Sequence, residues 1–312
     1  MIEQESVAVL LSSAYESLKC VDLRSATASF ERALAIDFEA PETLWSLKCA
    51  HFWSECLARL EGMANRFERG EYLVAQWKAF AAFASKLEGD YERALFAYKR
   101  FAFSLALDQY SAIPPEERES HEADISLRAG ICLKGMGDYI GAMRSLETAA
   151  REKKDDAEVL AQLADAYALQ GDERDSKALF REAFFIAPQR VDVELLESDL
   201  VRRLAARVAS LGYKGAELAE WIPVYGALLG VFSIKRELKA VEVGKLRQSV
   251  YQLENEAKEG GEDRAILVPR LINRYFWLID HYLAAKEDRA RIDEVLLKVR
   301  LLDQSIYKQY TA

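Results

Sequence analysis

Two stretches of this chain have residue types that could bind a phosphate or a metal. The stretch AGICLKGMGD, residues 129–138, carries three glycines, but a phosphate-binding loop needs lysine directly after its second glycine and Met136 stands there. Cys49, His51 and Cys56 form a cysteine–histidine cluster. On a helix Cys49 and Cys56 share a face and His51 does not, and no fourth ligand with zinc spacing is visible. We therefore expect turn and packing glycines, two buried thiols and no metal.

The remaining ionisable residues give no pattern typical of catalysis. His121 and His281 have no recognisable Ser, Cys or Asp partner motif for a triad. The acidic pairs Asp155-Asp156 and Glu116-Glu117 fall in expected turns, where a solvated surface is the ordinary outcome. The sequence predicts a protein that is not an enzyme and has no cofactor.

Composition restricts the class of protein. The 312 residues are 51% hydrophobic and 30% charged, with a net charge of −9 that disfavours nucleic acid as a partner. No window holds the run of about 18 apolar residues that a spanning helix needs, so no membrane insertion is expected. The start, MIEQESVAVLLSS, has acids where a secretory signal has basic residues. Four scattered cysteines without a CxxC pair fit reduced thiols, and we expect a cytoplasmic protein.

Residue usage indicates an all-α fold. Only 6 prolines and 15 glycines interrupt long stretches of Ala, Leu, Glu, Lys and Arg, which are strong helix formers. No convincing run of alternating β-branched residues predicts a strand. The apolar segment LAEWIPVYGALLGVF is broken by Glu220, Pro223 and two glycines, so we expect it to pack in a core.

The segment 160–188 predicts a short helical hairpin. Leu160, Leu163, Ala164 and Tyr167 share one face of a first helix. Gly171 and Asp172 supply a break. A second stripe, formed by Ser176, Phe180 and Ala183, precedes a terminating proline, Pro188.

This pattern resembles the tetratricopeptide (TPR) repeat, whose signature is W-x2-L-G-x2-Y, then A-x3-F, then P, over 34 residues. Similar units share its register, with breaks at Gly137-Asp138 and Gly89-Asp90 and a further second-helix stripe at Ala26, Phe30 and Ala33. We expect about five units over 1–190, with an inserted loop near 109–122. The unit at 41–74 is degenerate, and we expect one long or kinked helix there.

Residues 191–312 show no repeat. A longer helix is expected over 189–211, followed by a break at LGYKG, residues 211–215, and about four more helices. Gly260-Gly261 is the clearest loop. These helices are expected to stack on the array as a C-terminal cap.

The TPR resemblance implies a right-handed superhelix of hairpins whose first helices line a concave, partner-binding groove. Subtracting the packing positions leaves the expected groove residues, which are Tyr15, Trp45, Phe52, Phe83, Lys86, Leu127, Ile131 and Asp165. The asparagines of the family's carboxylate clamp are absent, so that mode of binding is not expected.

Two functions remain open from the residues. One is an interaction scaffold that holds a peptide, a helix or a small apolar ligand in the groove. The other is a regulatory or assembly subunit that wraps another subunit or forms a homo-oligomer through its C-terminal helices. An enzyme whose catalytic residue is hidden in the C-terminal region is the least favoured reading.

Overall fold

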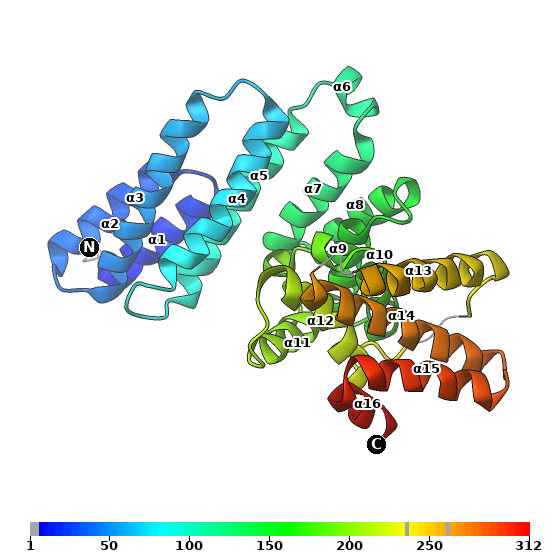
Figure 1. The fold of residues 1–312 in the computed structure, drawn as a ribbon. Coiled ribbons are helices and arrows are strands. Elements are labelled where there is room, and N and C mark those ends of the chain that lie inside the picture. Colours follow the sequence, from blue (N-terminus) through cyan, green and yellow to red (C-terminus); the bar gives the residue numbers. More distant parts are fainter. Residues whose placement is uncertain (1–5, 235–236, 260–262) are drawn as a thin grey trace. The chain divides into compact units, whose positions relative to one another are not determined.

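The protein is built from α-helices, as the composition predicts. The computed structural model describes residues 6–234, 237–259 and 263–312 (Figure 1). Helices make up 80% of the structure and no strand occurs in the described ranges. The expected loop at Gly260-Gly261 lies outside them.

The chain divides by its internal contacts into two compact units, 1–149 and 150–312. Unit 1 contains α1 (Val7–Lys19), α2 (Leu23–Ile36), α3 (Pro41–Glu61), α4 (Arg66–Ala84), α5 (Glu92–Ser111), α6 (Pro115–Glu119), α7 (Glu122–Gly135) and most of α8 (Tyr139–Glu152). Unit 2 contains α9 (Ala157–Leu169), α10 (Glu173–Ile186), α11 (Asp199–Ala209), α12 (Gly215–Leu228), α13 (Ala240–Glu259), α14 (Arg264–Ala284), α15 (Arg289–Leu302) and α16 (Gln304–Thr311). The hairpin of α9 and α10, which matches the TPR pattern best, therefore lies in unit 2 with residues 191–312.

The glycine–aspartate pairs end and restart helices as their chemistry demands. Gly137 and Gly171 have φ values of +86° and +87°, a left-handed conformation that glycine adopts without strain. After Gly171, the side chain of Asp172 accepts a hydrogen bond from the Asp175 N–H at 3.2 Å and caps α10. The expected hairpin between α9 and α10 is confirmed at this turn.

Unit 1 is held together by helices that approach closely. Helix α1 packs against α2 and α5, α4 packs against α5, and α5 packs against α7. A Cβ atom on Gly130 of α7 would lie 2.5 Å from Cγ of Leu146 on α8, so only glycine allows this approach. The contact between α1 and α5 brings the first and fifth helices together, which a stack of strictly nearest neighbours does not do.

The expectation of one long or kinked helix over 41–74 is wrong after residue 61. Helix α3 ends at Glu61, and α4 starts at Arg66 and continues to Ala84. The side chain of Asn65 accepts the Glu68 N–H at 3.0 Å, which caps α4. The degenerate unit thus contributes one complete helix and the start of the next.

The expected helix over 189–211 is also wrong in its first half. Two 3-10 turns, Pro188–Arg190 and Val193–Leu195, precede α11. The N–H groups of Glu197 and Ser198 donate to the carboxylate of Asp165, at 2.8 and 2.9 Å, instead of to carbonyls one turn earlier. Asp165 therefore replaces the helical hydrogen bonds just before α11.

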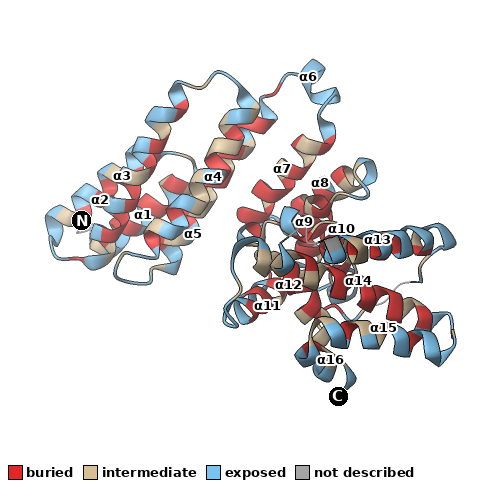
Figure 2. Ribbon diagram, viewed as in Figure 1, coloured by how far each residue is buried: buried red, intermediate tan, exposed pale blue. Residues whose placement is uncertain are grey.

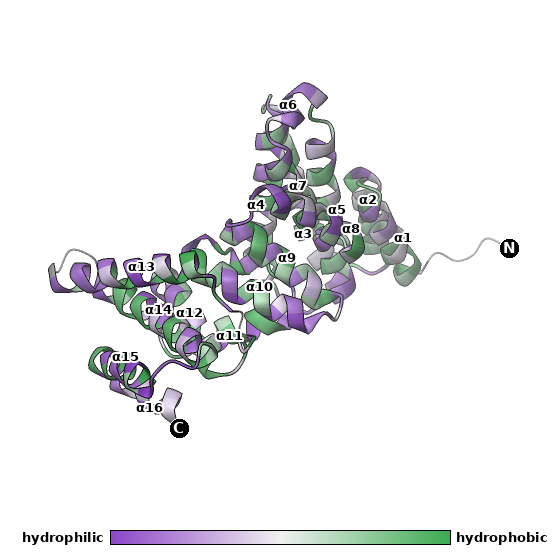
Figure 3. Cartoon of the chain, turned by 90° about the vertical axis from the view of Figure 1, so that its right-hand side faces the viewer, coloured by the Kyte–Doolittle hydropathy of each residue, from purple (hydrophilic) through white to green (hydrophobic). Residues whose placement is uncertain are grey.

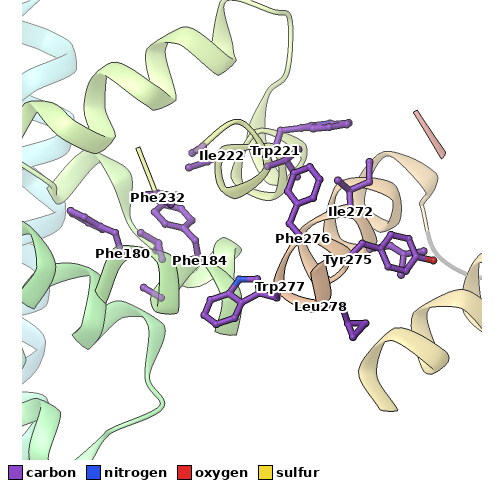
Figure 4. Packing of buried hydrophobic residues seen from close by; sticks show 14 of the residues in the cluster. Phe180, Phe184, Trp221, Ile222, Phe232, Ile272, Tyr275, Phe276, Trp277 and Leu278 are labelled. Atoms are coloured by element: carbon purple, nitrogen blue, oxygen red, sulfur yellow. The ribbon is translucent and has the colours of Figure 1, made fainter. Parts of the chain in front are cut away.

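Unit 2 has one large apolar core. Phe180 and Phe184 of α10 and Trp221 of α12 belong to the same buried cluster as Phe276 and Trp277 of α14 (Figure 4). Helix α14 is buried over most of its length (Figure 2). The described residues after α11 form five helices where about four were expected, because Asp303 caps a separate α16.

Helix α14 also supplies hydrogen-bond donors to the last backbone carbonyls of α10. Asn273 Nδ2 donates to the Phe184 carbonyl at 3.3 Å and Arg274 Nη1 donates to the Phe185 carbonyl at 2.7 Å. Carbonyls in the last turn of a helix have no partner within that helix. Arg181 of α10 pairs with Asp280 and lies 4.4 Å from the ring centroid of Trp277. These contacts fix α14 along α10.

Hydrophilic and hydrophobic residues are mixed along the labelled helices (Figure 3). No helix within the described residues is long and apolar enough to cross a membrane.

The hairpin of α9 and α10 leads to a prediction about packing. Ala164 of α9 is fully buried, so Ala164→Leu should lower the free energy of unfolding by roughly 1–3 kcal/mol through overpacking. Denaturant unfolding of the full chain measures this, with Ala206→Leu on the exposed side of α11 as a control that should be nearly neutral. Equal stability of the two variants would mean that Ala164 does not lie at a close helix contact.

Candidate functional site

The expected groove residues differ in their access to solvent. Seven lie in unit 1, and Asp165 lies in unit 2. Those that are buried are Tyr15, Trp45, Leu127, Ile131 and Asp165. Phe52 and Phe83 are half-buried, and Lys86 is exposed. Only the last three can meet a partner without a change in the fold.

Tyr15 joins two helices. Its hydroxyl on α1 donates a hydrogen bond of 2.6 Å to Oε1 of Glu42 on α3, and its ring lies 5.9 Å from that of Phe30. Burial, followed by the hydrogen bond to Glu42, raises the pKa of the Tyr15 hydroxyl above its ordinary value. Tyr15 is therefore a core residue whose hydroxyl links α1 to α3.

Trp45 belongs to the same core. Its ring packs edge-on against Tyr91 and Tyr98, with centroid distances of 5.7 and 6.3 Å. Next to it, the Tyr98 hydroxyl donates a 2.6 Å hydrogen bond to the Ser46 carbonyl, which ties α5 to α3. The aromatic character that suggested a groove here serves packing between helices.

Phe52 and Phe83 form an aromatic pair that reaches the surface. The rings, from α3 and α4, stack with centroids 5.3 Å apart and planes inclined by 24°. Fully buried Phe80 and Trp53 lie behind Phe52, at centroid distances of 5.4 and 5.7 Å. This rigid backing fixes the outward position of the pair.

Charged residues flank the aromatic pair in the sequence. Lys48 stands one turn before Phe52 on α3, and Lys86 lies in the turn after α4, three residues after Phe83; both are exposed. We name Phe52, Phe83, Lys48 and Lys86 the aromatic patch. The patch combines apolar area with positive charge.

A pocket of about 480 Å³ in unit 1, with both polar and apolar walls, was not foreseen from the sequence. It is lined by the start of α4, by residues 113–121 and by α7. Residues 113–121 belong to the loop expected near 109–122, of which the structure assigns 109–111 to α5 and 115–119 to the short helix α6. Arg128, on its wall, donates from Nε to Oε1 of Glu71 at 2.7 Å, and the Tyr110 hydroxyl donates to the same oxygen at 2.6 Å. Because these groups satisfy one another, the pocket offers no unused charge at that point.

The thiols and the histidine of the expected cluster lie as the helical spacing indicates. Cys49 and Cys56 are buried, and His51 is 78% exposed and 3.2 Å from Glu55. Burial raises the pKa of the Cys49 thiol to about 12, so it stays protonated near neutral pH. Among the described residues, no group of three or more His, Cys, Asp or Glu side chains is placed to hold a metal ion.

Neither a protein-family model nor a curated protein matches this chain.

Phe30 and Phe83 differ in burial, which predicts different costs in stability when each is replaced by alanine. Phe30 is fully buried, so Phe30→Ala should cost about 3–5 kcal/mol of unfolding free energy. Phe83 is only half-buried, so Phe83→Ala should cost clearly less. Urea unfolding followed by circular dichroism gives both values. A loss for Phe83→Ala as large as that for Phe30→Ala would assign Phe83 to the core.

Proposed function

We propose that this protein is a non-enzymatic interaction module of the TPR type that binds a protein segment at the aromatic patch of unit 1. The observation that carries the proposal is the stacked, half-buried pair of Phe52 and Phe83 on two neighbouring helices. Large aromatic side chains in well-packed surroundings supply most of the binding energy in typical interfaces.

The backing of the pair favours tight binding. Phe80 is fully buried against Phe52, with ring centroids 5.4 Å apart, and also contacts Phe83 at 6.5 Å. A side chain that is already held in place loses little conformational entropy when a partner covers it. The partner's contact residues are then apolar or aromatic, with an acidic residue nearby to meet Lys48 or Lys86.

We also propose that residues 1–190 form an array of TPR-type hairpins. Its support is the sequence register together with hairpins such as α9 and α10 that turn at glycine. The contact of α1 with α5 departs from nearest-neighbour stacking, so in unit 1 the resemblance is best carried by individual hairpins. A right-handed superhelix over 1–190 and a cytoplasmic location are further parts of the proposal, the latter resting on the reduced cysteines.

The test is partner retention by matched variants. Wild-type protein, Phe83→Ala and Phe38→Ala are used to capture partners from an extract of the source organism, and the dominant partner is then purified and titrated. Phe38 is 75% exposed and belongs to the turn after α2, so it controls for the loss of an exposed phenylalanine. Phe83→Ala should weaken binding by roughly 2 kcal/mol or more, whereas Phe38→Ala should bind like wild type.

Binding that is equally strong in all three proteins would contradict the aromatic patch as the interface. Thermal melts of each variant ensure that a loss of binding is compared between folded proteins.

A second function, assembly through the C-terminal helices, is favoured by exposed apolar side chains. Leu297 and Leu301 lie one turn apart on α15 and are 53% and 74% exposed. Tyr251 and Val241 of α13 are 65% and 71% exposed. Exposed apolar residues that gather on one region often mark an interface between proteins.

The assembly function predicts self-association that depends on α15. Sedimentation velocity of wild-type protein should show a concentration-dependent oligomer, and the double substitution Leu297→Glu and Leu301→Glu should leave a monomer, because two carboxylates cannot be buried without partners. The double substitution Arg289→Glu and Asp293→Lys, which keeps the charge of this exposed stretch, serves as the control. A wild-type monomer at all concentrations would exclude self-association by this surface.

A further inference from the structure

A second pocket lies entirely within unit 2 and has a different chemistry from the aromatic patch. It has a volume of about 520 Å³ and follows one side of α11. Its apolar wall comes from Leu200 and Leu204 of α11 and from Leu229 and Val231 after α12. A small cavity with mainly apolar walls and a few polar groups is the usual form of a small-molecule site.

Two hydroxyl groups in this pocket have no hydrogen-bond partner. Ser176, at the start of α10, is fully buried, and Ser198, just before α11, is 5% exposed. Within the part of the chain that the structure describes, neither Oγ atom has a partner. A buried hydroxyl without a partner is costly, and an oxygen atom of a bound molecule can supply the missing acceptor.

One positively charged side chain of the pocket has no acidic partner among the described residues. Glu173 pairs with Lys177 at 3.0 Å, and Asp199 pairs with Arg203 at 2.5 Å. Arg207 also lines the pocket, and its guanidinium has no ion-pair partner among the described residues. The acids are therefore already neutralised, and Arg207 is available for a carboxylate.

Ser198 and Arg207 are the first and last residues of the stretch 198–207 that lines the pocket. Leu200, Leu204 and Arg207 fall at i, i+4 and i+7, on one face of α11. Ser198 precedes Arg207 by nine residues, which corresponds to roughly 13 Å along a helix. A ligand that uses both ends must be elongated and apolar in the middle.

We infer that this pocket binds a linear aliphatic carboxylate with a second oxygen at its far end. The carboxylate pairs with the guanidinium of Arg207, the aliphatic chain lies along Leu200 and Leu204, and the far oxygen meets the hydroxyls of Ser176 and Ser198. This site is independent of the aromatic patch, so either can fail without the other.

The test is calorimetric titration of the full chain with two probes, ω-hydroxydecanoate and decanoate. Wild-type protein should bind the hydroxylated probe about five-fold more tightly, since it alone reaches the buried hydroxyls with an oxygen. Arg207→Gln should lower the affinity for both probes by about five-fold or more. Arg202→Gln, an exposed arginine of α11 outside the pocket, should change neither.

A double serine variant tests the far end separately. The double substitution Ser176→Ala and Ser198→Ala removes both hydroxyls, neither of which has a partner, so this variant should fold normally and should bind the two probes with equal affinity. A peptide that ends in a leucine carboxylate is titrated in parallel as the other source of this chemistry.

Three results would overturn the inference. They are no saturable binding of either probe, equal binding by Arg207→Gln and wild type, and tighter binding of the peptide than of ω-hydroxydecanoate. The last would make the pocket a site for a chain terminus.

Discussion

The close approach of paired helices is the constraint on which the rest of the structure depends. At the crossing of α4 and α5 a Cβ atom on Gly70 would lie 2.4 Å from the ring of Tyr110. In the turn after α12, the ring of Phe232 lies 2.3 Å from the place that a Cβ atom on Gly226 would take. Neither ring could keep its position if the glycine carried a side chain. Because interiors are close-packed, the aromatic residues can fill both cores only where the backbones leave this room.

Close packing also explains why polar groups in the cores tie helices together. Tyr98 donates to the Ser46 carbonyl, and Asp165 accepts two backbone N–H groups before α11. In unit 2 the buried carboxylate of Glu220 accepts from Arg270 Nη2 at 2.7 Å. Burial lowers the pKa of the nearby Arg274 to about 10. A buried polar group without a partner is costly, so these contacts favour one arrangement of helices within each unit.

The surface that we propose for binding is what this packing leaves uncovered. In unit 1 that is the outer edge of the aromatic core, where Phe52 and Phe83 are half-buried above Phe80. In unit 2 it is a pocket in which Ser176 and Ser198 keep unused hydrogen-bonding capacity. The two surfaces differ in kind, since the first offers rigid aromatic area and the second offers separated polar ends.

The sequence by itself determined the helical class and the turns at the glycine–aspartate pairs. Helix-forming composition, the 3.6-residue spacing of apolar residues and the glycine at Gly137 and Gly171 act over a few neighbouring residues, so they can be interpreted from the chain alone. It also indicated that Cys49 and Cys56 would be buried together on one helix face.

Only the tertiary structure decided which helix faces are covered. Tyr15, Trp45 and Asp165 fall on helix faces that the repeat pattern leaves open, yet partners distant in sequence bury them: Glu42 for Tyr15, Tyr98 for Trp45 and the segment before α11 for Asp165. The pocket along α11 could not be predicted from the sequence either, because its walls come from four separate segments of the chain. Periodicity reports which residues share a face, but the burial of that face depends on contacts between residues far apart in the chain.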